Sequence, residues 1–158
     1  MVLKLLEEKQ LSAKTSKCFF GVQEVEYLGH IVSHEGVKVD PNKIKSIKEW
    51  KIPTTIKHIR GFMGLIGYYR KFVKNYGRIS TPLTSLLKKE AFSWIPEATN
   101  TFEHLKEVMC QAPVLATLDF TKTFIVECDA SGNGIGAILM QSGRIISFES
   151  FPIKVKYL

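Results

Sequence analysis

The chain has 158 residues, of which 45% are hydrophobic, so it is long enough for one ordinary domain with a real core. Its net charge of +7 is unevenly placed: residues 41–95 hold 12 Lys and Arg against 2 Asp and Glu, residues 1–40 hold 5 against 6, and residues 96–158 hold 5 against 7. Such a basic block favours polyanions, above all nucleic acid, with a solvated surface as the alternative.

Cysteine usage and hydropathy exclude several classes of protein. Cys18, Cys110 and Cys128 are far apart and show no spacing typical of zinc ligands, so neither a structural zinc site nor a disulfide framework is expected, and a reducing compartment fits. No apolar run approaches the length of a membrane span, so we expect no membrane partner. The first ten residues contain two glutamates and no signal-peptide core, so we expect no targeting segment there.

Short elements are predicted before residue 41. Leucines near helical spacing predict an amphipathic helix from Val2 to about Leu11. Three β-prone runs follow, at 17–22 (KCFFGV), 25–33 (VEYLGHIVS) and 37–40. We expect them to form a small antiparallel piece that needs a neighbour to cover one face.

Four helices are predicted in the basic middle of the chain. The first begins at Asp40-Pro41, with aspartate as cap and proline at the first helical position, and stops at Pro53. The second is one long helix from Thr54 to Gly77, with Gly77 as a left-handed cap. A short third helix runs from Thr81-Pro82 to Lys89, and a fourth begins at Pro96 and ends before Pro113. Trp50 and Trp94 are expected to anchor this helical unit.

The long helix is expected to have two different faces. At about 100° per residue, an apolar stripe faces inward. The stripe contains Phe62, Leu65, Tyr69, Phe72 and Tyr76, and the opposite face carries Lys57, Arg60, Gly64, Tyr68 and Lys71. A basic face with a central glycine and an aromatic is the strongest functional signal in the chain. The alternative is that Gly61, Gly64 and Gly67 only permit tight helix packing.

After residue 123 the hydrophobic period changes to two. Three strands are predicted, FIVECDAS, GIGAILMQ and GRIISFES, separated by turn signals at Ser131-Gly132-Asn133-Gly134 and Ser142-Gly143. We expect an antiparallel meander with no helix after it to cover the sheet. Asp119 is expected in a turn between the helices and this sheet.

The order of these motifs resembles a known family. KCFF, YLGHIVS, GFMGLIGYYRKFV, TPLTSLLKK, FSW, APVL and CDASGNGIGAILMQ occur in the order found in Pol polyproteins of gypsy-type long-terminal-repeat retrotransposons. The resemblance spans the end of the reverse transcriptase palm, the thumb and the start of the ribonuclease H domain. Short reading frames left by such elements also occur in plant genomes, including mitochondrial ones.

The family implies two metal-dependent active sites, which this chain does not retain. Its polymerase site uses paired aspartates, but no Asp-Asp pair occurs in the sequence. Asp129 matches the first ribonuclease H carboxylate, whereas Glu127 and Glu149 match no ligand position. One carboxylate holds Mg²⁺ only weakly, so we interpret Asp129 as a relic ligand and weak metal candidate. No cofactor is expected, with Mg²⁺ binding only if another chain completes the site.

The resemblance also implies a nucleic-acid surface. The hairpin of Tyr27, Leu28, Gly29 and His30 is similar to the primer-positioning hairpin of the family. The thumb helix of the family follows the minor groove of the template–primer duplex, and here Gly64 would let the backbone approach the sugar edges. The residues interpreted as binding nucleic acid are Lys57, Arg60, Gly64, Tyr68, Arg70, Lys71 and Lys74, whereas Tyr69 and Phe72 are expected in the core.

These observations predict an α+β fold with three parts: residues 1–40 as the end of the palm with its hairpin, 41–115 as a helical thumb, and 116–158 as a truncated three-stranded ribonuclease H-like sheet. The first functional hypothesis is a non-catalytic remnant with weak, non-specific affinity for RNA–DNA or DNA duplexes. The alternatives are a ribonuclease H completed by another chain and an interaction module that uses the uncovered sheet. The sequence does not define the compartment; the resemblance favours a mitochondrial origin.

Overall fold

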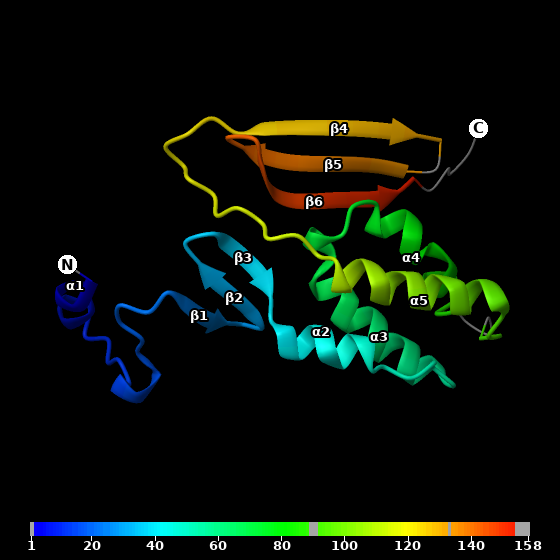
Figure 1. Cartoon of the computed structure of the whole chain (residues 1–158), viewed down its shortest axis with the longest axis horizontal. Helices are drawn as coiled ribbons and strands as arrows, with labels where there is room; N and C mark the ends of the chain where they lie inside the picture. The colour runs from blue at the N-terminus through cyan, green and yellow to red at the C-terminus, as the bar shows by residue number, and fades with distance from the viewer. Residues whose placement is uncertain (1, 89–91, 133, 154–158) are drawn as a thin grey trace.

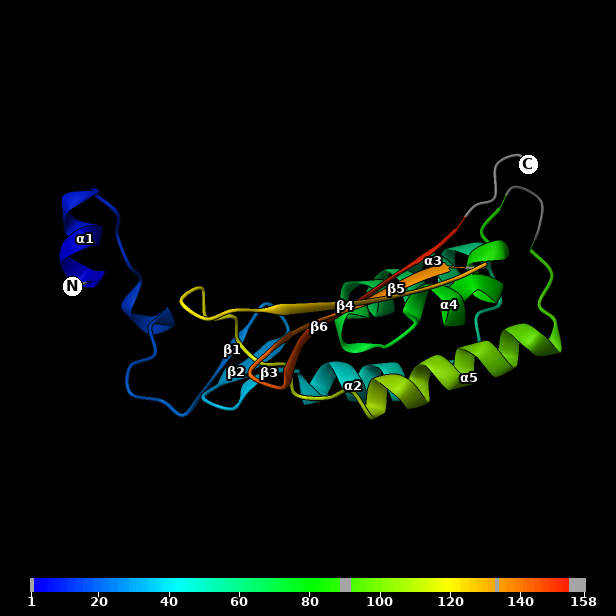
Figure 2. The ribbon, with the colours of Figure 1, turned by 90° about the horizontal axis from the view of Figure 1, so that it is seen from above.

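The structure is a computed structural model that describes residues 2–88, 92–132 and 134–153. It is an α+β fold, as predicted, with two three-stranded antiparallel sheets and a group of helices (Figure 1). The first part of the chain contains α1 (Val2–Glu8), the 3₁₀ turn η1 (Thr15–Lys17) and the strands β1 (Glu24–Tyr27), β2 (His30–Ser33) and β3 (Gly36–Val39). α1 lies at one end of the molecule, away from the other helices in both views (Figure 1, Figure 2).

The first sheet differs from the predicted one in its strands. The run KCFFGV was predicted as a strand, but residues 18–23 form none, and Phe20 is 74% exposed. The run at 25–33 was predicted as one strand, but it divides into β1 and β2 around Leu28 and Gly29, both with positive φ. The prediction failed because two left-handed residues reverse the chain inside a continuous β-prone run, which is the geometry of a type I′ hairpin.

The helical part contains α2 (Pro41–Lys48), α3 (Ile56–Tyr68), the 3₁₀ turn η2 (Arg70–Phe72), α4 (Tyr76–Ser85) and α5 (Pro96–Cys110). The Asp40 side chain caps α2 by accepting a hydrogen bond of 2.8 Å from the amide of Asn42, and Pro41 opens the helix, as predicted. The predicted fourth helix is also confirmed as α5.

The predicted single helix from 54 to 77 is wrong. α3 ends at Tyr68, and the chain then passes through η2 and a left-handed Asn75 (φ 59°) before α4 begins. Gly77 lies inside α4 and is no cap, and the predicted helix start at Thr81-Pro82 is also wrong because Pro82 lies within α4. The predicted end of that helix at Lys89 lies outside the described residues. A Cβ on Gly77 would lie 2.9 Å from the carbonyl oxygen of Ser150, so the glycine permits close approach of the second sheet.

An aromatic and aliphatic core joins α3, α4 and α5. The rings of Phe62 and Phe102 lie 4.5 Å apart, and Trp50 and Trp94 pack edge-on against them, as their predicted anchoring role requires. Tyr69 and Phe72 are buried, which confirms their predicted place in the core. The other large side chains buried here are Ile47, Ile59, Ile66, Val73, Leu83, Leu105 and Met109.

The second sheet contains β4 (Ile125–Ser131), β5 (Gly134–Gln141) and β6 (Arg144–Pro152), in the predicted antiparallel order. β6 is the strand nearest α4, and β4 lies farthest from the helices (Figure 1). All seven residues of β4 are exposed. The prediction of an uncovered sheet therefore holds for β4 only, because β5 and β6 are mostly half-buried and β6 contacts α4, and Asn133 of the predicted turn lies outside the described residues.

The segment after α5 connects the two sheets. Leu115 exchanges two backbone hydrogen bonds with Val37 of β3, at 2.7 and 2.9 Å, and the amide of Ala116 donates to the carbonyl of Ile145 in β6 at 2.7 Å. Gly36 is required beside this contact, because its φ is 136° and a Cβ there would lie 2.1 Å from the carbonyl oxygen of Leu115. The side chain of Arg144 donates to the carbonyl of Glu35 and adds a further link.

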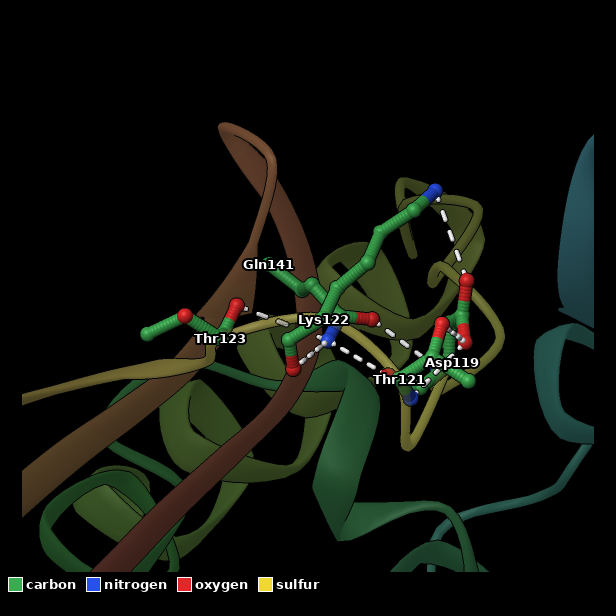
Figure 3. Close-up of polar contacts among 5 residues, drawn as sticks. All are labelled: Asp119, Thr121, Lys122, Thr123 and Gln141. Carbon is green, nitrogen blue, oxygen red and sulfur yellow. Dashed lines mark hydrogen bonds and ion pairs between the residues drawn. The ribbon is translucent and has the colours of Figure 1, made fainter.

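Gln141 fixes the loop that leads into β4 (Figure 3). Its buried side-chain amide accepts from the amide of Asp119 at 2.9 Å and donates to the carbonyls of Asp119 and Lys122, both at 2.9 Å. Asp119 also accepts hydrogen bonds from the amide and hydroxyl of Thr121, which confirms its predicted place in a turn. The side chain of Gln141 thus forms the hydrogen bonds to the loop backbone that a neighbouring strand would otherwise form.

Replacing Gln141 by methionine keeps the side-chain length but removes these hydrogen bonds. We expect the free energy of unfolding to fall by about 2 kcal/mol, because buried backbone groups lose their partners. Urea unfolding monitored by circular dichroism measures the change. Gln111→Met, at an exposed position after α5, is the control and should change stability by less than about 0.5 kcal/mol. Equal unfolding curves for both variants would contradict the role given to Gln141.

Candidate nucleic-acid interface

The exposed face of α3 is open over its whole length. Lys57, Arg60 and Gly64 are all exposed, and a Cβ built on Gly64 would meet nothing within 4 Å. Gly61 and Gly67 differ, because a Cβ at these positions would lie 3.6 Å from Trp50 and 3.5 Å from Tyr76. These are ordinary van der Waals distances, so an alanine would fit at 61 and 67, and the described structure requires a glycine at none of the three positions.

The break after Tyr68 separates the remaining cationic residues from this face. Arg70 lies in η2 and forms an ion pair with Glu149 of β6, with a distance of 3.8 Å between Nε and Oε2. Lys71 is half-buried, and its ammonium lies 5.4 Å from the centre of the Phe72 ring. Lys74 is exposed and lines a pocket with Asp129. The structure thus brings Lys57, Arg60, Gly64 and Tyr68 together on α3 and places Arg70, Lys71 and Lys74 on the segment that follows.

The hairpin turn docks on the end of α3 through two adjacent tyrosines. The hydroxyl of Tyr68 donates to the carbonyl of Leu28 at 2.9 Å, and that of Tyr69 donates to the carbonyl of Gly29 at 3.0 Å. Gly29 has a φ of +74°, and a Cβ there would lie 2.6 Å from the Tyr69 hydroxyl, so only glycine fits this position. Tyr68 remains 52% exposed, so its ring is still accessible on the open face although its hydroxyl is engaged.

His30 lies beneath this contact. Its ring is 7% exposed, with the rings of Tyr68, Tyr69 and Phe72 at 5.5, 5.4 and 5.7 Å between centroids. Its Nδ1 lies 3.0 Å from the carbonyl of Leu28, so the neutral ring donates from Nδ1, and Nε2 has no hydrogen-bond partner among the described residues. Burial and, secondarily, the charge of Lys71 lower the pKa of His30, whereas burial raises the pKa of Tyr69. Both groups are therefore held neutral.

Asp129 lies apart from this interface, on the exposed strand β4. It lines a pocket of about 120 Å³ together with Asn75 and Arg78 at the start of α4. Among the described residues, no group of three or more Asp, Glu, His or Cys side chains could hold a metal ion. Asp129 also lines a second pocket with Glu127 and Glu149, but these described carboxylates form no group that could hold Mg²⁺, which needs several fixed oxygen ligands.

Sequence reasoning missed the contact between the hairpin and α3. Tyr69 was assigned to the core and Tyr68 to the groove face, whereas the structure shows that both hydroxyls hold the turn at Leu28 and Gly29. The available signal was the glycine inside a β-prone run, which is typical of a tight hairpin turn. Nothing in the sequence indicated which helix would meet that turn.

Comparison with known protein families identifies a domain in the last part of the chain. A family model described as an RNase H-like domain found in reverse transcriptase matches residues 94–154. It begins in front of α5, whereas the predicted boundary lies at residue 116, and that boundary stays a prediction. No helix in the described residues is long and apolar enough to cross a membrane.

Two relatives differ greatly in length. The chain is 43% identical over 152 residues to the retrovirus-related Pol polyprotein from transposon 297 of Drosophila melanogaster, with coverage of 95% of this chain and 14% of that polyprotein. It is 46% identical over 127 residues to an uncharacterized mitochondrial protein of Arabidopsis thaliana, with coverage of 79% of this chain and 80% of that protein. The chain thus spans a small part of the transposon polyprotein but most of the Arabidopsis protein.

The fold is also present in solved structures. The foamy viral protease-reverse transcriptase in complex with double-stranded DNA matches 98% of this chain and 28% of that chain, with a TM-score of 0.84 and 24% identity. The same enzyme in complex with RNA/DNA hybrid matches 84% of this chain and 19% of that chain, with a TM-score of 0.78. At this identity the likeness establishes the fold alone.

The matched domain and the retrotransposon relatives place the chain in the reverse transcriptase and ribonuclease H class, whose members are normally enzymes. More narrowly, the chain belongs to the family of retrovirus-related Pol polyproteins of retrotransposons, and it corresponds to a segment of them. The family expected from the motifs is confirmed.

The lowered pKa of His30 makes the stability depend on pH. The unfolded chain protonates near pH 6.5, above the pKa of the folded state, so acid stabilises the unfolded chain. We therefore expect the contribution of His30 to the free energy of unfolding to have its full value above pH 6.5 and to decrease as the pH drops towards 5. Urea unfolding at a series of pH values tests this. His30→Gln should flatten the profile between pH 7 and 5, whereas His34→Gln, at an exposed histidine, should leave it as in the wild type.

Proposed function

We propose that this protein is a non-catalytic remnant of a retrotransposon reverse transcriptase that binds nucleic-acid duplexes weakly and without sequence preference. The observation that carries the proposal is Gly64, exposed in the middle of α3 with open space where a side chain would be. A glycine inside a helix costs about 1 kcal/mol relative to alanine. Because no contact within the described structure explains a glycine at this position, we infer that a surface from outside the chain approaches the helix there.

The surroundings of Gly64 suit a duplex. Arg60 precedes it by one helical turn and Tyr68 follows it by one turn, so both flank the place where a groove edge would approach the backbone. Arginine and lysine neutralise phosphates without reading sequence, and a shallow minor groove presents sugar edges to a flat surface. The titles of the structural neighbours report complexes with double-stranded DNA and RNA/DNA hybrid, which supports a duplex as the ligand.

Two observations support the absence of catalysis. The chain contains no Asp-Asp pair of the kind that a polymerase site needs. Asp129 shares one pocket with Arg78 and another with Glu127 and Glu149, and the described residues form no group of three or more that could hold a metal ion. No cofactor is therefore required for the proposed function, and Mg²⁺ would enter only if another chain supplied the missing carboxylates and restored ribonuclease H activity.

A second candidate function uses the exposed second sheet. Phe124, Ile125 and Val126 are exposed at and before the start of β4, and such an edge pairs readily with another strand. A partner chain on this sheet would make the protein an interaction module. Sedimentation velocity at several concentrations separates this function from that of a monomeric duplex-binding protein.

The proposed compartment is the mitochondrion, and the support for it is one relative. The similarity to a mitochondrial protein of Arabidopsis thaliana supports mitochondria as the place where this protein is encoded.

Duplex binding should depend steeply on salt. We expect the wild-type chain to bind a 16-base-pair RNA–DNA hybrid at low salt and to lose affinity linearly in a plot of log K against log salt concentration. Arg60→Ala should reduce that slope by about 1, because one phosphate contact is removed. Lys4→Ala, at an exposed position of α1, is the matched control for charge. A flat salt dependence, or no binding at low salt, would contradict the proposal.

Gly64→Ala should increase the stability of the chain but weaken its binding to a duplex. The methyl group favours the helix, so the free energy of unfolding should rise by about 0.5–1 kcal/mol. The same methyl group prevents close approach of the groove, so we expect about tenfold weaker duplex binding, equivalent to about 1.4 kcal/mol. Fluorescence anisotropy and urea unfolding measure the two quantities. Unchanged affinity in the more stable variant would show that position 64 does not face the duplex.

The proposed absence of catalysis predicts no hydrolysis. An RNA–DNA hybrid incubated with the purified chain and Mg²⁺ should stay intact on a denaturing gel, because one carboxylate cannot position the metal ions that the family uses. Asp129→Asn should therefore behave as the wild type does. Metal-dependent cleavage by the wild type that disappears in Asp129→Asn would instead support the ribonuclease H alternative.

A further inference from the structure

The β1–β2 turn is held by more hydrogen bonds than a hairpin turn needs. The carbonyl of Leu28 accepts from the Tyr68 hydroxyl at 2.9 Å and lies 3.0 Å from Nδ1 of His30. The carbonyl of Gly29 accepts from the Tyr69 hydroxyl at 3.0 Å and from the amide of Asp40 at 3.1 Å. Both lone pairs of two successive carbonyls are therefore occupied, and three of the four donors are side chains.

The turn is not stabilised by its own sequence. Leu28 and Gly29 have φ values of 50° and 74°, which define a type I′ turn. Asparagine followed by glycine is preferred there, and a leucine in the left-handed region is strained. Leu28 is also 68% exposed, so burial of its side chain does not compensate for the strain. The strained conformation therefore depends on the hydrogen bonds that reach the turn from α3 and its end.

We propose that Tyr68 and Tyr69 are positioning residues that lock the β1–β2 turn to the end of α3, so that hairpin and helix form one rigid nucleic-acid-binding surface. The effect of this lock on binding rests on the proposed function, because a rigid surface changes affinity only if a duplex contacts both the hairpin and the helix. The lock itself is defined by the geometry alone.

Tyr69 and Tyr68 contribute in different ways. Tyr69 is buried and its raised pKa keeps the hydroxyl protonated, so it remains a donor at every physiological pH. Tyr68 is half-exposed, so water competes for its hydrogen bond. A bound duplex would cover Tyr68 and exclude that water, which strengthens the hydrogen bond at the moment of binding.

A pre-formed surface binds more tightly because less freedom is lost on association. Tyr68 was expected from the sequence to contact the groove itself. Because the hydroxyl is engaged by Leu28, it contributes to affinity through the placement of the turn, whereas the exposed ring remains accessible to the ligand. Loss of the hydroxyl should therefore change affinity without changing the number of phosphate contacts.

The test uses the full chain with Tyr68→Phe and Tyr69→Phe combined, and Tyr76→Phe as the control, since Tyr76 lies in α4 and makes no hydrogen bond to the turn. Without ligand, the ¹⁵N order parameters of Gly29 and His30 should fall from about 0.85 to below about 0.6 in the double variant. Hybrid affinity, measured well below the unfolding temperature, should fall about tenfold, with the salt slope unchanged because no charge is removed.

Leu28→Asn makes the test specific for positioning. This substitution lets the turn hold itself, so the affinity loss caused by the two phenylalanines should shrink to less than about twofold in the Leu28→Asn background. An affinity loss of equal size in both backgrounds would contradict the positioning role and indicate that the two hydroxyls contact the duplex directly. Unchanged order parameters in the double variant would overturn the lock. If the wild type binds no duplex while the order parameters fall as expected, the proposed function fails and the lock stands.

Discussion

The contact between the β1–β2 turn and the end of α3 is the constraint on which the arrangement of the first half of the molecule depends. His30 brings three aromatic rings together, and these rings belong to the segment where α3 gives way to η2. Tyr68 and Tyr69 donate their hydroxyl hydrogen bonds to the turn at the point where α3 ends, and after η2 the chain continues into α4, which contacts β6. The helix break thus links the hairpin to the second sheet.

Backbone segments pack closely against both sheets at two glycines. Gly36 lets Leu115 pair with β3, and Gly77 lets α4 approach Ser150 of β6. Each glycine lies where a Cβ would overlap a carbonyl oxygen, so each tolerates no larger residue without movement. Gly64 is different in kind, because the space beside it is empty. Gly21, Gly132 and Gly143 also have open space beside them, but among these four glycines only Gly64 lies inside a helix of the described structure.

The exposed cationic face of α3 and the carboxylate of Asp129 lie on different parts of the described structure. The open face of α3 retains its cations and its glycine, whereas Asp129 stands on a fully exposed strand without the carboxylates that would complete a metal site in the described residues. Binding by a helix face needs only local sequence, but a metal site needs ligands from several elements at once. Under the proposed function, a segment of a Pol polyprotein would therefore bind a duplex through one helix face without needing a complete metal site.

The sequence by itself determined the family, the α+β class, the capped start of α2, the limits of α5 and the three strands of the second sheet, because caps, prolines and periodicity act over a few residues. Only the tertiary structure decided the break at Tyr68, since residues 69–75 contain neither proline nor glycine and the left-handed Asn75 is a weak local signal. The roles of Tyr68 and Tyr69 were likewise invisible, because their hydrogen bonds reach residues 40 positions away in the chain.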